Sequence, residues 1–221
     1  MTDNEILQKI DHTLLKMTAS WQEIKTLCDE AVRFRTASVC VPPSYVKLIH
    51  DTYGETVNIC TVIGFPLGYN VTGAKVFEAQ EAIRSGASEI DMVINAGEVK
   101  NGNFEKVLEE IKEIKKACGS KILKVIIETC YLTEDEKIRM CKIVTEAGAD
   151  FIKTSTGFGT AGATLADVEL FKKHIGPEVK IKAAGGVKTR GDLEAFINAG
   201  AARIGTSSAV KLLSGENAGT Y

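Results

Sequence analysis

The chain alternates short apolar runs with longer amphipathic stretches from one end to the other. Short apolar runs bounded by turn residues are typical of buried strands, whereas apolar residues that recur about every three to four positions are typical of helices. The segment from Phe104 to Gly119 has the helical spacing and ends in lysines followed by glycine, as a helix C-terminus does. The apolar runs predict eight strands: Ile10–Leu14, Ala37–Val41, Asn58–Ile63, Glu89–Ile94, Leu123–Glu128, Asp150–Thr154, Lys180–Ala184 and Arg203–Thr206.

Caps and glycines predict where several helices begin and end. Ser20 with Glu23, and Thr133 with Glu136, have the spacing of a capping box. A weak internal repeat places a Gly-Ala pair directly before three of the predicted strands. We expect the glycines of this repeat to end helices at positive φ and to feed a tight loop into the next strand: Gly86, Gly148 and Gly200.

The order of the elements predicts the fold. Eight strands alternating with helices are typical of an α/β protein, here a single-domain (β/α)8 TIM barrel that spans residues 1–221. Only four prolines occur and no low-complexity linker interrupts the chain, so the sequence shows no domain boundary. The alternative is an open, doubly wound sheet, which would not require eight strands.

Composition narrows the classes of partner and site. A formal net charge of −2 gives no electrostatic case for nucleic acid or an anionic membrane. The N-terminus lacks the pattern of a secretory signal, and no apolar stretch approaches the roughly 18 residues that span a bilayer. Six cysteines without a CxxC pair, and three histidines without an HExxH motif, favour free thiols in a reducing cytoplasm over disulfides or a metal site.

The alternation of side chains along the predicted strands places several charged residues on the same face. Side chains alternate across a strand, so every second residue of a barrel strand faces the lumen. The charged set that would face the lumen is Asp11, Asp91, Lys124, Glu128, Lys153 and Lys182. Buried charges must pair, meet water or take part in chemistry, and the C-terminal ends of barrel strands carry active sites. The alternative is a structural salt-bridge network, which would more naturally lie at the opposite end of the barrel.

Two lysines at the ends of neighbouring strands, Lys153 and Lys182, predict Schiff-base chemistry. An amine attacks a carbonyl only when neutral, and an ordinary lysine with a pKa of about 10.4 is almost wholly protonated at neutral pH. A second ammonium group and a desolvated pocket lower the pKa of a lysine and free the nucleophile. We therefore expect one lysine to react and the other to keep it reactive, while Asp91 moves protons through water.

Glycine-rich loops follow the last three predicted strands. The segment GFGTAG (157–162) matches the dinucleotide pattern GxGxxG, but the acidic residue expected about 20 positions later is missing, so the pattern does not favour NAD. Loops after the seventh and eighth strands are where barrels commonly bind phosphate through backbone amides and a helix N-terminus. Here they contribute Gly185, Gly186, Gly205, Ser207 and Ser208. An ordinary tight turn is the alternative for each loop.

The chain resembles the deoxyribose-phosphate aldolase family over essentially its whole length, in the segments DHTLL, EIDMVINAG, LKVIIET, ADFIKTSTGFG, KAAGGV and RIGTSS. The resemblance implies a class I, metal-independent lyase on a (β/α)8 barrel, with no cofactor. Such an enzyme reversibly cleaves 2-deoxy-D-ribose 5-phosphate to acetaldehyde and D-glyceraldehyde 3-phosphate through a lysine Schiff base, in the degradation of deoxyribose phosphate. It also implies a cytoplasmic enzyme that forms a homodimer. Its ligand would be this phosphosugar, and it would bind neither nucleic acid nor a membrane.

The resemblance assigns roles to individual residues. Lys153 matches the Schiff-base lysine, Lys182 the lysine that perturbs it, and Asp91 the proton-shuttling aspartate. Asp11 and Lys124 match further polar residues of the family's active site. The positions that match contacts to the substrate and its phosphate are Gly157, Gly185, Gly186, Gly205, Ser207, Ser208 and the terminal Tyr221.

Some features leave alternatives open. Phe158 stands where longer members of the family carry a lysine, so one phosphate contact would be absent unless Lys188 replaces it. Cys40, at the end of the second strand, either borders the pocket or packs as an ordinary buried thiol. Three other functions fit parts of the pattern: a non-catalytic sensor of phosphorylated sugars, a pyridoxal-phosphate enzyme and a Schiff-base aldolase with another donor. Borohydride trapping would expose the sensor, and absorbance at roughly 400 nm would expose the pyridoxal cofactor.

Overall fold

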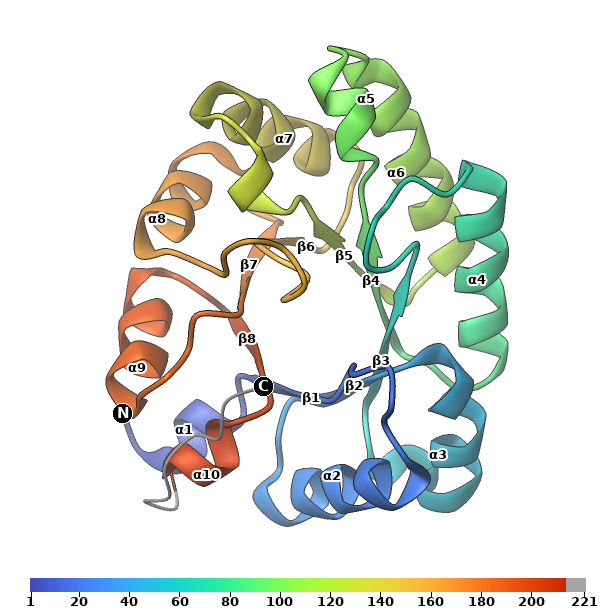
Figure 1. The fold of residues 1–221 in the computed structure, drawn as a ribbon, viewed down its shortest axis with the longest axis vertical. Helices are drawn as coiled ribbons and strands as arrows, with labels where there is room; N and C mark the ends of the chain where they lie inside the picture. The colour runs from blue at the N-terminus through green and yellow to red at the C-terminus, as the bar shows by residue number, and fades with distance from the viewer. Residues whose placement is uncertain (214–221) are drawn as a thin grey trace.

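The computed structural model describes residues 1–213 and arranges them around eight parallel strands that pair into a closed barrel. Strands that follow one another in the chain are neighbours in the barrel, and β1 (Ile10–Thr13) pairs with β8 (Arg203–Thr206) to close it. Helices surround the ring of strands, and the chain passes round the barrel once (Figure 1). The predicted (β/α)8 barrel is confirmed, and the open sheet is excluded because β1 and β8 leave no free edge.

All eight predicted strands are present, with ends that agree to within two residues. Ladder hydrogen bonds continue past some assigned ends, for example from Ile94 N to Ile126 O at 3.1 Å, so the differences concern only where pairing is judged to stop. The remaining strands are β2 (Ser38–Val41), β3 (Ile59–Ile63), β4 (Glu89–Val93), β5 (Ile122–Ile126), β6 (Phe151–Lys153) and β7 (Lys180–Ala184).

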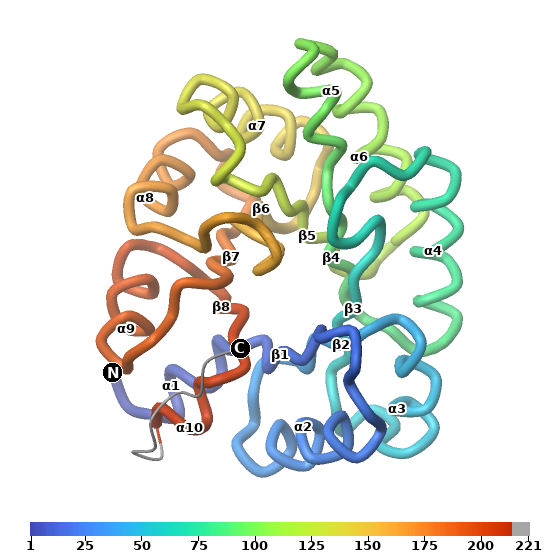
Figure 2. Tube along the Cα trace, in the orientation of Figure 1, coloured from blue at the N-terminus to red at the C-terminus, as the bar shows by residue number. Residues whose placement is uncertain are grey.

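Helices connect successive strands and cover the outside of the barrel (Figure 1). They are α1 (Asp3–Leu7), α2 (Trp21–Phe34), α3 (Val46–Tyr53), α4 (Thr72–Arg84), α5 (Ala96–Lys100), α6 (Phe104–Cys118), α7 (Glu134–Glu146), α8 (Leu165–His174), α9 (Arg190–Ala199) and α10 (Ala209–Leu213), with short 3-10 turns η1 (Pro43–Tyr45), η2 (Gly54–Thr56) and η3 (Thr129–Tyr131). Helix α1 contacts α10, so the two ends of the described chain meet (Figure 2). Within residues 1–213 none of these helices has the length and apolar character needed to cross a membrane.

The predicted helix caps are present. Backbone amides of Glu23 and Glu136 donate to Ser20 and Thr133 at the start of α2 and α7, and the glutamates bond back to the cap amides. The glycines of the Gly-Ala repeat end α4, α7 and α9 with φ of 112°, 70° and 125°: Gly86, Gly148 and Gly200. Positive φ strains other residues, which explains glycine at each of these turns into a strand.

Apolar side chains form two separate groups. The main core lies between the strands and the helices, and it includes Ile90 and Met92 from the outward face of β4. A second, much smaller group of Cys40, Cys60 and Val62 lines one side of the barrel interior. Much of the remaining interior is polar or charged, as parity predicts.

Candidate active site

Lys153 and Lys182 lie side by side inside the barrel. Lys153 ends β6, Lys182 is central in β7, and the two residues are direct partners in the ladder that joins these strands. Each ammonium group donates a 2.7 Å hydrogen bond to the same atom, Oδ2 of Asp91 on β4. Lys153 is only 3% exposed, and the other two side chains are fully buried. The residues expected to react, to modulate and to move protons are therefore in contact.

A third lysine contacts the other oxygen of Asp91. Lys124 on β5 is the ladder partner of Asp91 and donates to its Oδ1 at 2.8 Å. Burial raises the pKa of Asp91, but the ammonium groups of Lys124, Lys153 and Lys182 outweigh burial and hold this pKa well below its ordinary value of 3.8. Asp91 is therefore a carboxylate at neutral pH, placed to accept protons.

Asp11 on β1 is the second carboxylate of the cluster. Its Oδ2 lies 2.5 Å from Lys182 Nζ and 3.7 Å from Lys124 Nζ, and Ser38 donates to its Oδ1 at 2.8 Å. Burial raises the pKa of Asp11, but Lys182, Lys124 and Arg203 together lower it below its ordinary value. The five predicted catalytic residues thus form one connected group.

Lys182 and Lys124 remain cations in this group. Burial lowers the pKa of Lys182, but Asp11 and Asp91 more than compensate and raise it above its ordinary 10.5. The pKa of Lys124 is raised in the same way, against burial, with Asp91 as the main contributor. A charged Lys182 beside Lys153 is what the sequence-based hypothesis requires of the second lysine.

The sequence-based set omits two charged residues of the interior. Glu89, the first residue of β4, lies 2.6 Å from Lys124, and Arg203, the first residue of β8, lies 2.9 Å from Glu89 and also pairs with Asp11. Glu89 has the parity of Asp91, so following parity back to the start of β4 would have found it. The salt-bridge network considered as an alternative is therefore present, at the N-terminal ends of the strands and joined to the lysines above it.

Two thiols complete the contacts of the interior. Cys60 on β3 donates to Asp91 Oδ1 at 3.1 Å and accepts from Lys124 Nζ at 3.2 Å. Cys40 on β2 is fully buried and belongs to the same small cluster as Cys60. Parity would have placed Cys60 inward, but an uncharged residue in an apolar run gives no signal of a polar role.

Glu128 lies apart from the lysines. It follows β5 with a backbone φ of 51°, and its carboxylate accepts hydrogen bonds from the amide of Thr156, at 3.2 Å, and from the Thr156 hydroxyl. In residues 1–213 it forms no ion pair with the lysine cluster. Glu128 therefore holds the loop that follows Lys153 rather than joining the charged group.

The glycine-rich loops after β6 and β7 pack against each other. Gly185 and Gly186 have φ of 73° and 78°, and Gly157 has φ of 90°. A Cβ atom on Gly162 would lie 2.6 Å from the carbonyl carbon of Gly185, an approach that only glycine permits. The third glycine of GFGTAG thus serves the contact between two loops.

Gly205 and the two serines lie at the end of β8. Gly205 is the ladder partner of both Asp11 and Ala184, and a Cβ atom on it would lie 3.1 Å from Lys182 Cε. Ser208 is buried, and its amide donates to Thr206 Oγ1 at 3.1 Å, whereas Ser207 is half-buried. The loops that carry these residues and Gly185–Gly186 follow the neighbouring strands β8 and β7, the two positions at which the sequence predicts phosphate binding. Tyr221 lies outside the described residues.

Phe158 makes an apolar contact where longer relatives were expected to carry a lysine. Its ring meets that of Phe65 edge-on at 5.3 Å, and its side chain is 54% exposed. Phe65 in turn packs against the cluster of Cys40, Cys60 and Val62. The contact joins the loops that follow β3 and β6.

Two groups of buried atoms could offer ligands to a metal. The thiol and carboxylate atoms of Cys40, Cys60 and Asp91, and those of Asp11, Cys60 and Glu89, lie within 4.8 Å of one another. Ammonium groups already contact each of these carboxylates. A cation placed there would meet positive charge, so the arrangement favours amine chemistry over metal binding.

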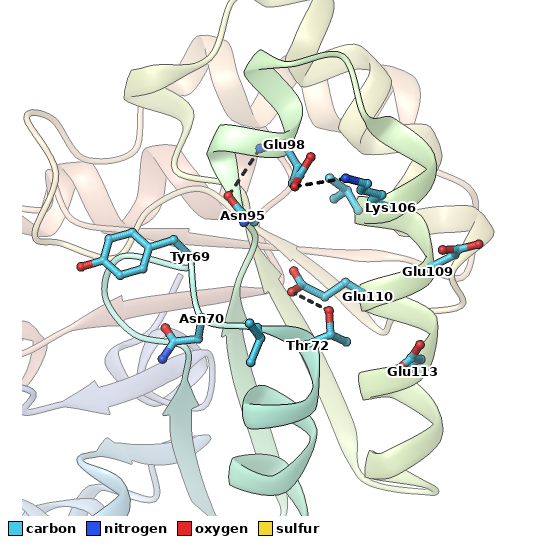
Figure 3. A pocket seen from close by; sticks show the side chains of 11 residues that line it. Tyr69, Asn70, Thr72, Asn95, Glu98, Lys106, Glu109, Glu110 and Glu113 are labelled. Atoms are coloured by element: carbon cyan, nitrogen blue, oxygen red, sulfur yellow. Dashed lines mark hydrogen bonds and ion pairs between the residues drawn. The ribbon is translucent and has the colours of Figure 1, made fainter.

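A pocket of about 340 Å³ lies outside the barrel, between α4 and α6, and does not include the lysine cluster. Its wall carries Glu98, Glu109, Glu110 and Glu113 (Figure 3). Glu110 is buried and pairs with Lys75 at 2.9 Å. Its acidic wall would repel a phosphorylated substrate, so this pocket is not the candidate active site.

Comparisons with known proteins agree on one family. A family model for DeoC/LacD family aldolases matches residues 6–217. The deoxyribose-phosphate aldolases of Clostridium botulinum (strain Alaska E43 / Type E3) and Clostridioides difficile (strain 630) are 62% and 61% identical, and cover 100% and 98% of this chain and 100% and 99% of their own. The solved structure of the aldolase QR15 has a TM-score of 0.91 at 43% identity, over 96% of this chain and 95% of that one. A tetrameric deoxyribose phosphate aldolase from Aeropyrum pernix has a TM-score of 0.90 at 32% identity, over 96% and 91%.

Proposed function

This chain belongs to the DeoC/LacD family of aldolases, and we propose that it is a lyase that reversibly cleaves 2-deoxy-D-ribose 5-phosphate to acetaldehyde and D-glyceraldehyde 3-phosphate through a Schiff base on Lys153. The observation that carries the proposal is the shared contact of two buried lysines with one carboxylate oxygen, each at 2.7 Å from Asp91 Oδ2. Relatives at 61% identity or more over nearly the whole chain act on the same class of phosphosugar, by name.

Lys153 is the nucleophile, because it is the lysine of the cluster at the C-terminal end of its strand. Lys182, one strand away and deeper, is held charged by Asp11 and Asp91. Attack on a carbonyl requires the neutral amine of Lys153, whose Nζ lies 2.7 Å from the proton acceptor Asp91 Oδ2. Neutral Lys153 adds to C1 of the open-chain sugar, and loss of water from the carbinolamine leaves an iminium.

Asp91 moves the protons. Its Oδ2 accepts hydrogen bonds from Lys153 and Lys182, and its Oδ1 accepts from Lys124 and Cys60. A carboxylate in this position accepts a proton during carbinolamine formation and, through water, from the C3 hydroxyl of the sugar. Because the neighbouring ammonium groups keep Asp91 ionised, it acts as an acceptor first and returns the proton later.

Removal of the C3 hydroxyl proton breaks the C2–C3 bond, and its electron pair moves onto the iminium to give an enamine. D-Glyceraldehyde 3-phosphate leaves with the new C3 aldehyde. The enamine is then protonated at C2 and hydrolysed, which releases acetaldehyde and restores Lys153. The iminium is the electron sink for cleavage of the C2–C3 bond, so the mechanism calls for no metal or redox cofactor.

The phosphate end of the substrate binds at the loops after β6, β7 and β8. Gly157, Gly185 and Gly186 adopt positive φ, and glycine loops of this kind can present backbone amides to an anion. Gly205, Ser207 and Ser208 supply the neighbouring loop, and Tyr221 would reach the site from the chain end. Phe158 offers no charge, so the amides carry more of the phosphate binding than they would beside a lysine.

A cytoplasmic setting, single-domain organisation and assembly into homodimers complete the proposal. The free cysteines support the first. A related aldolase is described as tetrameric, which supports assembly of copies without deciding their number.

Borohydride trapping tests the nucleophile directly. Incubation with acetaldehyde, reduction and peptide mapping should give a single ethyl adduct on Lys153, less of it in Lys182→Leu and none in Lys153→Ala. Lys75 is the internal control, because it is equally buried but pairs with Glu110 away from the cluster. Binding of the phosphosugar without any adduct would instead support a non-catalytic sensor, and an adduct without cleavage of deoxyribose 5-phosphate would indicate an aldolase with another donor.

A further inference from the structure

Cys40 and Cys60 face each other across two neighbouring strands. They are direct ladder partners on β2 and β3, and both point into the barrel with Val62. Neighbouring strands lie about 4.7–4.9 Å apart, within the roughly 4.4–6.8 Å between Cα atoms that a disulfide spans. The two Sγ atoms and a carboxylate oxygen of Asp91 all lie within 4.8 Å of one another. A bond between the thiols therefore requires side-chain rotation but little movement of the strands.

The two thiols have different chemical characters. Hydrogen bonding from the Cys60 thiol lowers the pKa of Cys40, with Lys182 and Lys153 acting in the same direction against burial. Burial, together with Cys40 and Asp91, raises the pKa of Cys60 well above its ordinary 9.0. The pKa of Cys40 is therefore the lower of the two, so Cys40 ionises more readily than Cys60, as an attacking cysteine does relative to its resolving partner.

The two thiols are fully buried, and a pocket adjoins the cluster to which they belong. Leu15, Val62 and Phe65 belong to the thiol cluster and also line a pocket of about 160 Å³. In addition, any aldehyde that reaches Lys153 enters the interior that the thiols line. Hydrogen peroxide is smaller than such an aldehyde, so the route that serves the substrate also serves the oxidant.

We propose that Cys40 and Cys60 form a dithiol modification site, which hydrogen peroxide converts to an intramolecular disulfide and which thereby controls the lysine cluster. The Cys40 thiolate attacks the peroxide, the O–O bond breaks, and Cys40 sulfenic acid and hydroxide result. The Cys60 sulfur then displaces hydroxide from the Cys40 sulfur. The Cys60 proton and one proton from solvent convert the two hydroxides to water, so peroxide is reduced and two thiols are oxidised.

The disulfide changes the contacts of Asp91. Cys60 loses the proton that it donates to Asp91 Oδ1, and the rotated sulfur no longer accepts from Lys124. The carboxylate that holds Lys153 and Lys182 is then less well positioned. The effect on turnover rests on the proposed function, whereas formation of the disulfide does not.

The experiment treats the full-length protein with hydrogen peroxide, alkylates the remaining thiols and maps the tryptic peptides. Lys47 lies between the two cysteines, so a Cys40–Cys60 disulfide joins two separate peptides and lowers the intact mass by two hydrogen atoms. We expect this linked peptide, a loss of kcat of about tenfold, the equivalent of one hydrogen bond to a charged group, and recovery with dithiothreitol. KM should change much less, because the phosphate loops are untouched.

Matched variants separate this site from other thiols. The activity of each variant after peroxide treatment is compared with its own activity before treatment. Cys40→Ser and Cys60→Ser should keep their activity. Cys130→Ser, which alters the one cysteine that is not buried, should lose activity as the parent protein does. A linked peptide in a protein without aldolase activity would contradict the proposed function but would still support the dithiol site. Absence of the linked peptide, or equal loss of activity in Cys60→Ser, would overturn the dithiol site.

Discussion

Two groups of buried lysines and carboxylates lie on opposite sides of the barrel wall at β4. Inside, Asp91 is surrounded by Lys124, Lys153 and Lys182. Outside, Lys75 on α4 donates to Glu110 on α6 at 2.9 Å and to the carbonyl of Val93 at 2.8 Å. Both groups are removed from water, yet the environment acts on their protonation in opposite directions.

Inside the barrel the partner charges outweigh burial. The pKa of Asp91 falls and that of Lys182 rises, so both charged forms are stabilised. Outside, burial outweighs the partner: the pKa of Glu110 is raised despite Lys75, and that of Lys75 is lowered despite Glu110. Each of these outer side chains has one charged partner within hydrogen-bond distance in residues 1–213, whereas Asp91 has three.

The difference separates a chemical site from a structural one. A carboxylate with several cationic partners keeps its charge and can exchange protons repeatedly, whereas a lone buried pair gains little over apolar side chains of similar volume. The inner group should therefore tolerate no replacement, and the outer pair should tolerate replacement of both members together.

The largest effect is expected at Lys153. Lys153→Ala removes the proposed nucleophile and should lower cleavage of deoxyribose 5-phosphate by about four orders of magnitude or more. The release of glyceraldehyde 3-phosphate, measured with a coupled dehydrogenase, checks this loss. Lys75→Met combined with Glu110→Leu is the control and should retain activity. Turnover of Lys153→Ala within tenfold of the parent protein would end the assignment of the nucleophile.

Asp91→Asn should lower both activity and stability. The amide cannot accept protons as the carboxylate does, and it leaves three buried ammonium groups without their shared counter-charge. We expect turnover to fall by about two to four orders of magnitude and the free energy of unfolding by about 3–5 kcal/mol. Urea unfolding and the cleavage assay measure the two effects. An inactive variant with unchanged stability would contradict the view that Asp91 holds the lysines together.

The outer pair should affect stability alone. Lys75→Met or Glu110→Leu by itself leaves an unpaired buried charge and should cost about 3–5 kcal/mol, whereas the double variant should stay within about 1 kcal/mol of the parent protein. Urea unfolding of all four proteins forms a double-mutant cycle. In each folded variant kcat/KM should remain unchanged, so a loss of activity in the double variant would show that the barrel wall couples the two groups.

The alternation of side chains along the strands explains how much of the fold and of the candidate site could be predicted from the sequence. Strands, caps and the inward set of Asp91, Lys124 and Lys153 follow from alternation, which depends only on local backbone geometry. Glu89 and Arg203 were within reach of the same rule at the first residues of their strands. Within residues 1–213, the candidate active-site and phosphate-loop residues lie on the strands and loops that the sequence predicts.

Contacts that depend on three-dimensional register could not be predicted. Cys60 reaches Asp91 and Lys124 only because β3, β4 and β5 pair in one particular register. The pairing of Lys75 with Glu110 likewise depends on how α4 and α6 pack, since 35 positions separate them in the chain. A lysine within a polar helix gives no sequence signal of complete burial.

The smallest expected effect is a difference in how pH changes the contribution that each group makes to the free energy of unfolding of the protein. The folded pKa of Glu110 lies above its ordinary 4.5, so its contribution to stability is present below that value and is lost as the pH rises through the folded pKa. The folded pKa of Asp91 lies below its ordinary 3.8, so its contribution is present above that value and is lost only as the pH falls further. As the pH is lowered from 7 to about 4, the stability of Lys75→Met/Glu110→Leu relative to the parent protein should therefore fall, while the deficit of Asp91→Asn persists. Urea unfolding at several pH values measures both slopes, and a relative stability of the double variant that instead rises on acidification would show that the partner charge, not burial, controls Glu110.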